Sequence, residues 1–191
     1  MGTHDNVNDA APTEGGTAAR THPAALAAIA TLEQCERFLT DLDDEVYCRT
    51  CDAVQGSTIG QHLRHSLDHV HASLSALDGV EIDYDHRERE TRIERDRHAA
   101  LTSIRETCAR LACVDEKAAS RTACVRVMLD DSGAESTLGS TLGREIAFAS
   151  HHALHHQAMI GAIAHRLGVA PPEGFGRAPS TVRHDRRVGR G

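Results

Sequence analysis

Aromatic residues and long apolar runs are scarce in this sequence of 191 residues. It contains no tryptophan, two tyrosines and three phenylalanines, so a hydrophobic core has to be built from aliphatic side chains and alanine. No run of about 18 apolar residues occurs, and we therefore expect neither a transmembrane helix nor a membrane partner. The first residues are polar and acidic and lack the apolar region of a signal peptide, so we expect a cytoplasmic protein.

Basic residues are also in the minority. The formal net charge is −7, with 28 acidic residues against 21 basic ones. A general nucleic-acid-binding protein needs a net basic face to neutralise phosphates, so nucleic acid is not an expected partner. Among the six cysteines, Cys48 and Cys51 form a C-x-x-C pair. This pair lacks both the second pair of a zinc ribbon and the strand–helix context of a thioredoxin motif, which favours two incidental, reduced thiols.

Apolar periodicity indicates the organisation of the chain. It predicts four helices, over residues 23–41, 58–77, 88–112 and 142–167. A period of two over 124–129 and a second stretch at 137–141 predict a hairpin between the last two helices. We therefore expect an all-α fold, an up-down four-helix bundle with a small β-hairpin before the last helix. The predicted units are a disordered N-terminal segment, the bundle domain and a flexible C-terminal tail, over 1–20, 21–170 and 171–191 respectively.

Histidine is the residue in excess, at 14 of 191 positions. One cluster, HHALHH, starts at His151 in the last predicted helix. On a helical wheel, at about 100° per residue, His152 and His156 fall near the middle of the apolar face, whereas His155 falls towards its edge. Imidazoles on a buried face need polar partners, and a metal ion bound by an H-x-x-x-H pair is one such partner.

A second histidine cluster lies on the predicted helix 58–77. His62, His65 and His69 share an arc of about 60° on the wheel. Side chains on facing helices of a bundle meet in its interior, where bundle metal sites are built. One of these histidines, with His152 and His156, gives three nitrogen ligands and leaves positions open for water or substrate, as in catalytic metal sites. The wheel favours His62, which lies nearer the apolar face than His65.

Two motifs resemble those of the DinB-like superfamily of four-helix-bundle metalloproteins. The first is STIGQHLRH, over Ser57–His65, and the second is HALHHQAMI, over His152–Ile160. The resemblance covers about residues 22–168, and the second motif carries most of it. In that family, one histidine late in the first motif and two from H-x-x-x-H in the second bind a divalent metal.

The resemblance implies a ligand set and a cofactor. Matched residue by residue, it points to three metal ligands, His65, His152 and His156. Other histidines remain as alternative ligands or as partners that orient the ligands, namely His62, His69 and His155. The implied cofactor is one divalent metal ion, and three imidazoles suit zinc, nickel or iron.

The same resemblance implies a class of reaction. Relatives include thiol transferases that use bacillithiol or mycothiol and a thiol-dependent maleylpyruvate isomerase, in which a metal lowers the pKa of a thiol and holds the thiolate. The leading hypothesis is a metal-dependent transferase, or a related hydrolase or isomerase, acting on a small molecule with a low-molecular-weight thiol. The alternative is a non-catalytic metal- or ligand-binding bundle of a stress response. No residue is predicted to be catalytic.

A run of alternating arginines and acids follows residue 84. Such a run is typical of a solvated helix face laced with ion pairs. Its first members, Arg87 and Arg89, lie beside Tyr84 in the sequence. These three residues are the candidates for binding a substrate carboxylate. Bundles of this kind often pair through their outer helices, so a homodimer is a further expectation that the sequence leaves open.

Overall fold

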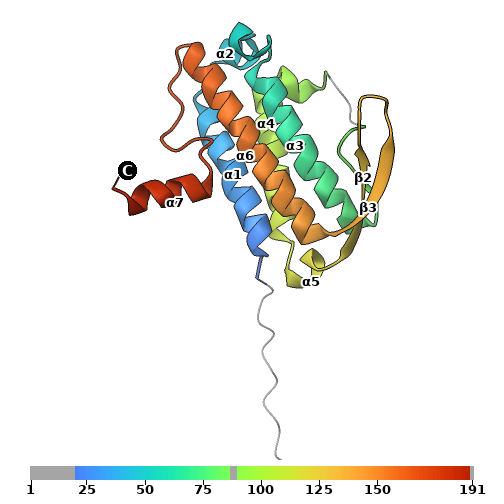
Figure 1. Cartoon of the computed structure of the whole chain (residues 1–191). Helices are drawn as coiled ribbons and strands as arrows, with labels where there is room; N and C mark the ends of the chain where they lie inside the picture. The colour runs from blue at the N-terminus through green and yellow to red at the C-terminus, as the bar shows by residue number, and fades with distance from the viewer. Residues whose placement is uncertain (1–19, 87–89, 190–191) are drawn as a thin grey trace, which may run out of the picture.

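The computed structural model describes residues 20–86 and 90–189 (Figure 1). Four long helices form the body of the molecule, α1 (Pro23–Thr40), α3 (Ile59–Ser75), α4 (Arg97–Ala112) and α6 (Leu142–Arg166). α6 packs against α1 and α3, and α4 packs against the same two helices. The core that they enclose is mainly leucine, isoleucine and alanine, as the composition predicts. None of the described helices is long and apolar enough to cross a membrane.

Local sequence explains where the two histidine-bearing helices begin. Thr58 and Gln61 form a capping box at the start of α3, in which each side chain accepts a hydrogen bond from the other residue's backbone N–H at 3.1 Å. At the start of α6, the Thr141 hydroxyl accepts a hydrogen bond from the Arg144 backbone N–H at 3.3 Å. The N-terminal turns of α3 and α6 are therefore fixed by their own sequences.

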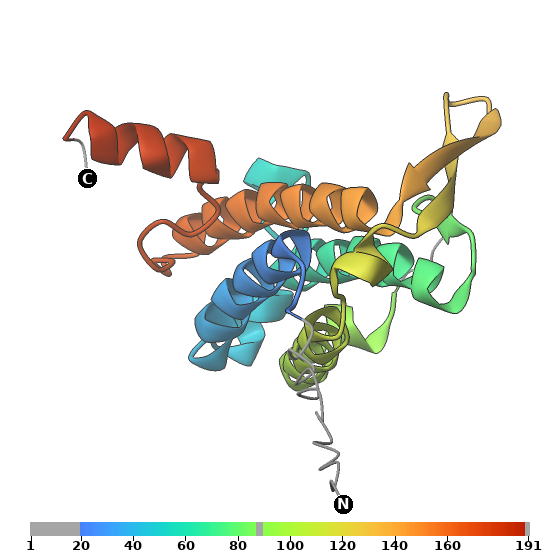
Figure 2. The same ribbon diagram turned by 90° about the horizontal axis from the view of Figure 1, so that it is seen from below.

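A three-stranded mixed sheet lies beside the helices. β2 (Thr122–Met128) and β3 (Glu135–Thr141) form an antiparallel hairpin whose register runs from Thr122 opposite Thr141 to Met128 opposite Glu135. β1 (Ile82–Asp83) pairs with β2 in parallel, with Ile82 opposite Val125. β3 ends at Thr141 and α6 starts at the next residue, so the hairpin continues directly into the helix. The hairpin and α7 lie at opposite ends of α6 (Figure 2).

The prediction of an all-α, up-down four-helix bundle is wrong. The described residues form seven α-helices and a three-stranded mixed sheet. β1 has two residues, too few to show a period of two in the sequence. The additional α-helices lie in segments that we expected to be connections or tail, namely α2 (Asp44–Cys48), α5 (Glu116–Ala119) and α7 (Pro179–Arg187). Three 3-10 turns complete the elements, η1 (Asp52–Val54), η2 (Ala76–Asp78) and η3 (Arg92–Glu94).

The third long helix is also shorter than its predicted range of 88–112. α4 starts at Arg97, because the Asp96 side chain accepts a hydrogen bond from the Ala99 backbone N–H at 3.0 Å and caps the helix there. The preceding η3 turn packs against α3, where Arg64 Nε donates to Glu94 Oε1 at 2.9 Å in a buried ion pair. Nearly all of the predicted N-terminal segment, residues 1–19, lies outside the described residues.

Gly60 allows the close approach of α3 to η3, and we expect Gly60→Ala to destabilise the protein. An added Cβ would overlap the carbonyl oxygen of Glu94 and lie 2.9 Å from Tyr47 Cε1. Alanine normally favours a helix over glycine, but overpacking of this kind costs about 1–3 kcal/mol of unfolding free energy. Urea denaturation followed by circular dichroism measures the change.

Gly161 in α6 is the matched control for this substitution. A Cβ there would meet the Phe175 ring at 3.5 Å, an ordinary van der Waals contact. Gly161→Ala should therefore leave the stability unchanged or raise it by up to about 1 kcal/mol. A Gly60→Ala protein as stable as the parent would contradict the close packing of α3 on η3.

Candidate metal centre

The histidine clusters lie on two helices that pack side by side, α3 and α6 (Figure 1). α3 contributes His62, His65 and His69, and α6 contributes His152 and His156. Each set has members four residues apart, which places them on one face of the helix. The two faces meet, so side chains nearly a hundred positions apart in the sequence come into contact.

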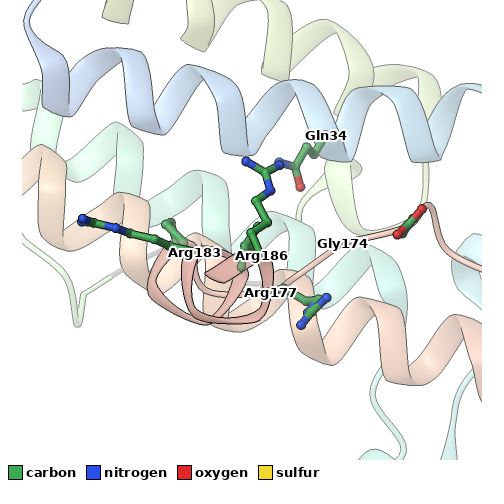
Figure 3. A pocket seen from close by; sticks show the side chains of 8 residues that line it. Gln34, Gly174, Arg177, Arg183 and Arg186 are labelled. Carbon is green, nitrogen blue, oxygen red and sulfur yellow. The ribbon is translucent and has the colours of Figure 1, made fainter. Parts of the chain in front are cut away.

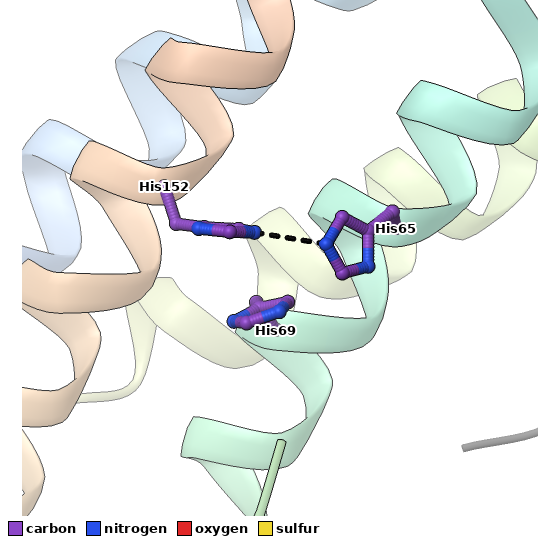
Figure 4. A group of neighbouring side chains, drawn as sticks. All are labelled: His65, His69 and His152. Atoms are coloured by element: carbon purple, nitrogen blue, oxygen red, sulfur yellow. Dashed lines mark hydrogen bonds between the residues drawn. The ribbon is translucent and has the colours of Figure 1, made fainter. Parts of the chain in front are cut away.

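Three of these histidines form a compact group, His65, His69 and His152 (Figure 4). His65 Nε2 and His152 Nε2 lie 3.0 Å apart. The His69 ring stacks on the His152 ring, with 3.7 Å between their centroids, and lies 4.7 Å from the His65 ring. One nitrogen atom of each histidine lies within 4.8 Å of those of the other two. Three imidazole nitrogens this close together can hold a metal ion.

His62 and His156 form a second pair next to this group. Their Nδ1 atoms lie 2.8 Å apart. The Ser57 hydroxyl donates its proton to the Val54 carbonyl at 2.6 Å, so at 2.9 Å from His62 Nε2 it acts as the acceptor. This arrangement assigns the proton of neutral His62 to Nε2 and leaves a lone pair on Nδ1, facing His156.

The three sequence-predicted ligands lie next to one another in the structure, but one of them, His156, is outside the convergent group. The His156 ring centroid lies 4.5 Å from that of His65 and 4.7 Å from that of His152. The group whose nitrogens converge contains His69 in place of His156. The alternative candidate His62 contacts His156, whereas His155 is exposed, with its ring 5.2 Å from that of His156.

Sequence reasoning gave His69 too little weight, although a signal for it was present. His65 and His69 stand in the same H-x-x-x-H spacing as His152 and His156. Of the four, His69 is the most buried, with 6 % of its surface exposed. A pair with ligand spacing on each of two facing helices is a stronger pattern than one pair and a single histidine.

Two histidines of the cluster, His156 and His62, are held in the uncharged form at neutral pH. Burial, together with neighbouring His65 and His152, lowers the pKa of His156 to about 3. Burial and nearby His155 also lower the pKa of His62. A neutral imidazole is the form that binds a metal, and His62 and His156 are in that form at neutral pH.

Tyr84 packs against the histidine cluster at His69, and Glu145 holds Tyr84 in place. The Tyr84 ring stacks on the His69 ring, with 4.9 Å between centroids and 10° between planes. Its hydroxyl donates to Glu145 Oε2 at 2.8 Å. Burial raises the pKa of Glu145, but hydrogen bonds from Ser140, Tyr84 and Arg144 outweigh this and lower it below its usual value. Buried Glu145 is therefore a carboxylate that orients Tyr84.

The other sequence candidates lie elsewhere. Arg87 and Arg89, predicted with Tyr84 to bind substrate, fall outside the described residues. Cys48 is exposed and donates to the Arg95 carbonyl at 3.3 Å, and Cys51 is a buried free thiol. Neither cysteine belongs to the group that could hold a metal in the described part of the chain.

A cavity of about 480 Å³ lies at the other end of α6, lined mainly by the C-terminal segment (Figure 3). Arg177, Arg183 and Arg186 line it together with Gln34 of α1. The arginine side chains point in different directions, and Arg177 forms an ion pair with Asp185. They do not converge on one point, so we assign no anion site to this cavity.

Comparison with known proteins gives one partial similarity. No protein-family model and no solved structure matches the chain. A stretch of 45 residues is 51% identical to FK506-binding protein 5 of Rhizopus delemar, which corresponds to 24% of this chain and 12% of that protein. The match spans about an eighth of the relative's length, and it carries no conclusion about activity here. The resemblance to the DinB-like superfamily stays a prediction.

We expect the metal-free protein to lose stability as the pH falls below about 6.5, the pKa of an unfolded histidine. His156 has a pKa of about 3 in the folded protein. Between these values the unfolded chain binds a proton that the folded chain does not, so acid favours unfolding. The free energy of unfolding should fall by about 1–2 kcal/mol between pH 7 and pH 5, measured by urea denaturation with a chelator present.

His156→Gln is the variant that tests the origin of this pH dependence. It removes the titrating group and should make the fall between the two pH values smaller. His165→Gln, at an exposed position of the same helix, should leave the parent's pH dependence unchanged. Equal stability of the parent at both pH values would show that His156 titrates normally in the folded protein.

Proposed function

We propose that this chain binds one divalent metal ion between α3 and α6 and uses it in a transfer reaction on a small-molecule substrate. The observation that carries the proposal is the convergence of His65, His69 and His152, whose nitrogens lie within 4.8 Å of one another. The low pKa of His156 supports it, because this neighbour of the group is uncharged at neutral pH and adds no positive charge beside a bound cation. The resemblance to the DinB-like superfamily supports a thiol as the nucleophile.

The donor set fits the proposed ion. All candidate donors are imidazole nitrogens, which suit zinc, nickel and iron and are poor ligands for magnesium or calcium. Three protein ligands leave at least one coordination position for a substrate. A divalent cation supplies a Lewis acid there, which lowers the pKa of a thiol or of water and favours its nucleophilic form.

The surrounding residues have defined tasks in this proposal. Tyr84 covers one face of His69 and restricts its ring orientation. Phe148 lies 6.1 Å from both His69 and His152, measured between ring centroids, and is an apolar neighbour of both rings. Glu145 holds the Tyr84 hydroxyl and keeps the ring in its stacked position. These residues position the histidines before any ligand binds, which lowers the entropic cost of assembling the site.

Removal of single histidines tests the metal site. We expect untagged parent protein to bind about one equivalent of zinc by equilibrium dialysis and elemental analysis. His65→Ala, His69→Ala and His152→Ala should each weaken zinc binding by more than the roughly 10–100-fold typical of changes to residues that only orient a ligand. His71→Ala is the control, because His71 lies on α3 but contacts Thr107 instead of the cluster.

The comparison of His69→Ala with His156→Ala identifies the third ligand. Loss of zinc only in His69→Ala supports the convergent group, whereas loss only in His156→Ala assigns that position to the sequence-predicted ligand. Undiminished zinc binding in both His65→Ala and His152→Ala would overturn the metal site. Circular dichroism of each variant confirms that the fold is retained.

The transfer reaction requires a separate test. Zinc-, nickel- and iron-loaded protein is assayed with a low-molecular-weight thiol and a panel of electrophiles. We expect turnover that a chelator abolishes and added metal restores. Metal binding without metal-dependent turnover on this panel would contradict the transferase part of the proposal.

A further inference from the structure

A cavity of about 360 Å³ lies between the β2–β3 hairpin and the first two turns of α6. Its volume is at the lower end of the range for small-molecule pockets. Its apolar and aromatic lining residues are Val125, Val127, Leu138, Tyr84 and Phe148, and its charged lining residues are Arg144 and Glu145. The cavity therefore has apolar walls and, in its lining, a guanidinium group paired with a carboxylate.

The apolar wall comes from one face of the hairpin and from α6. Val125 pairs with Leu138 in the strand register, and Val127 follows two residues later on the same face. Leu138 and Phe148 are large apolar side chains that remain 52% and 39% exposed. Exposed apolar groups gathered at one cavity favour an apolar ligand, because its binding removes them from water.

The charge at the cavity comes from Arg144. Its guanidinium carbon lies 5.4 Å above the Phe148 ring, and Nη1 donates to Glu145 Oε1 at 2.7 Å. Glu145 also accepts hydrogen bonds from Ser140 at 2.5 Å and Tyr84 at 2.8 Å, so its carboxylate is well satisfied within the protein. Nη2 and Nε of Arg144 have no hydrogen-bond partner among the described residues and remain able to bind an anion.

We propose that this cavity binds a small aromatic carboxylate. The carboxylate lies on the guanidinium of Arg144, whose planar array of donors matches a carboxylate better than a spherical anion. The aromatic ring lies against Phe148 and the Val125–Leu138 pair. Glu145 also lines the cavity and pairs with Nη1 of Arg144, so the carboxylate of the ligand would use the two remaining donors of that guanidinium, Nε and Nη2.

The position of the cavity gives this ligand a role in the proposed function. Tyr84 and Phe148 line the cavity and also contact the histidines, with Tyr84 stacked on His69 and Phe148 near His152. The cavity and the metal ligands thus share two neighbours, Tyr84 and Phe148. Only one part of the inference rests on the proposed function, namely that the bound aromatic carboxylate is a substrate of the metal centre. Binding itself does not depend on a metal.

Isothermal titration with phenylacetate and its neutral isostere phenylacetamide tests the inference. The full chain is used in a chelator-containing buffer, so that the metal site does not contribute. We expect phenylacetate to bind about tenfold more tightly than phenylacetamide, because a charge-assisted hydrogen bond is made only by the acid. Arg144→Gln should remove this preference, and Arg144→Lys should retain part of it.

Two further variants separate charge from packing. Arg105→Gln is the matched control, because Arg105 is an exposed arginine on α4 that pairs with a glutamate, Glu36, as Arg144 pairs with Glu145. It should leave both affinities unchanged. Leu138→Ser removes part of the apolar wall at an exposed position and should weaken the acid and the amide by the same factor.

The outcomes distinguish this inference from the metal site. Absence of phenylacetate binding, equal binding of acid and amide, or an unchanged preference in Arg144→Gln would overturn the inference, whatever the zinc measurements give. Preference for phenylacetate that depends on Arg144 in a chain that binds no zinc would support the cavity and contradict the proposed metal function. Thermal denaturation of each variant checks that it is folded, so that a change in affinity is not caused by unfolding.

Discussion

The rest of the structure depends on one constraint: histidine rings have to be accommodated between two packed helices, α3 and α6. α3 and α6 meet along faces that carry five histidines, and an imidazole removed from water needs partners for its nitrogens. The protein supplies them across the interface, where His65 faces His152 and His62 faces His156. These contacts require one axial register between the helices. The N-terminal cap of each helix fixes where that helix begins, and Gly60 allows α3 to lie close against η3.

Much of the helical structure could be predicted, because helices are stabilised by local caps and by apolar side chains that recur along one face. The predicted ranges 23–41 and 142–167 differ from α1 and α6 by one residue at the C-terminal end. The fold class could not be predicted, because β1 exists only through its pairing with β2, some forty residues away. α7 has no buried residue, so its sequence contains no apolar stripe that would have indicated a helix.

The candidate site could be predicted as far as the two helices and most of the histidines. A helical wheel gives the direction of a side chain but not the level at which it meets a neighbouring helix. That level determines whether His69 or His156 joins His65 and His152 in the convergent group, and it follows from the packing of α3 on α6. The contact between Tyr84 and His69 could not be predicted from the sequence either. Tyr84 follows β1 in an irregular stretch, and the pairing of β1 with β2 helps to bring it to the histidines.

The junction between β3 and α6 has a mechanical consequence. Thr141 is both the last residue of the strand and the cap of the helix, so no flexible joint separates the two elements. The hairpin projects from the body and exposes Leu129 at its turn, with 64% of that side chain accessible. It is joined, without intervening residues, to the helix that carries His152, so the direction in which the hairpin projects is tied to the first turn of that helix.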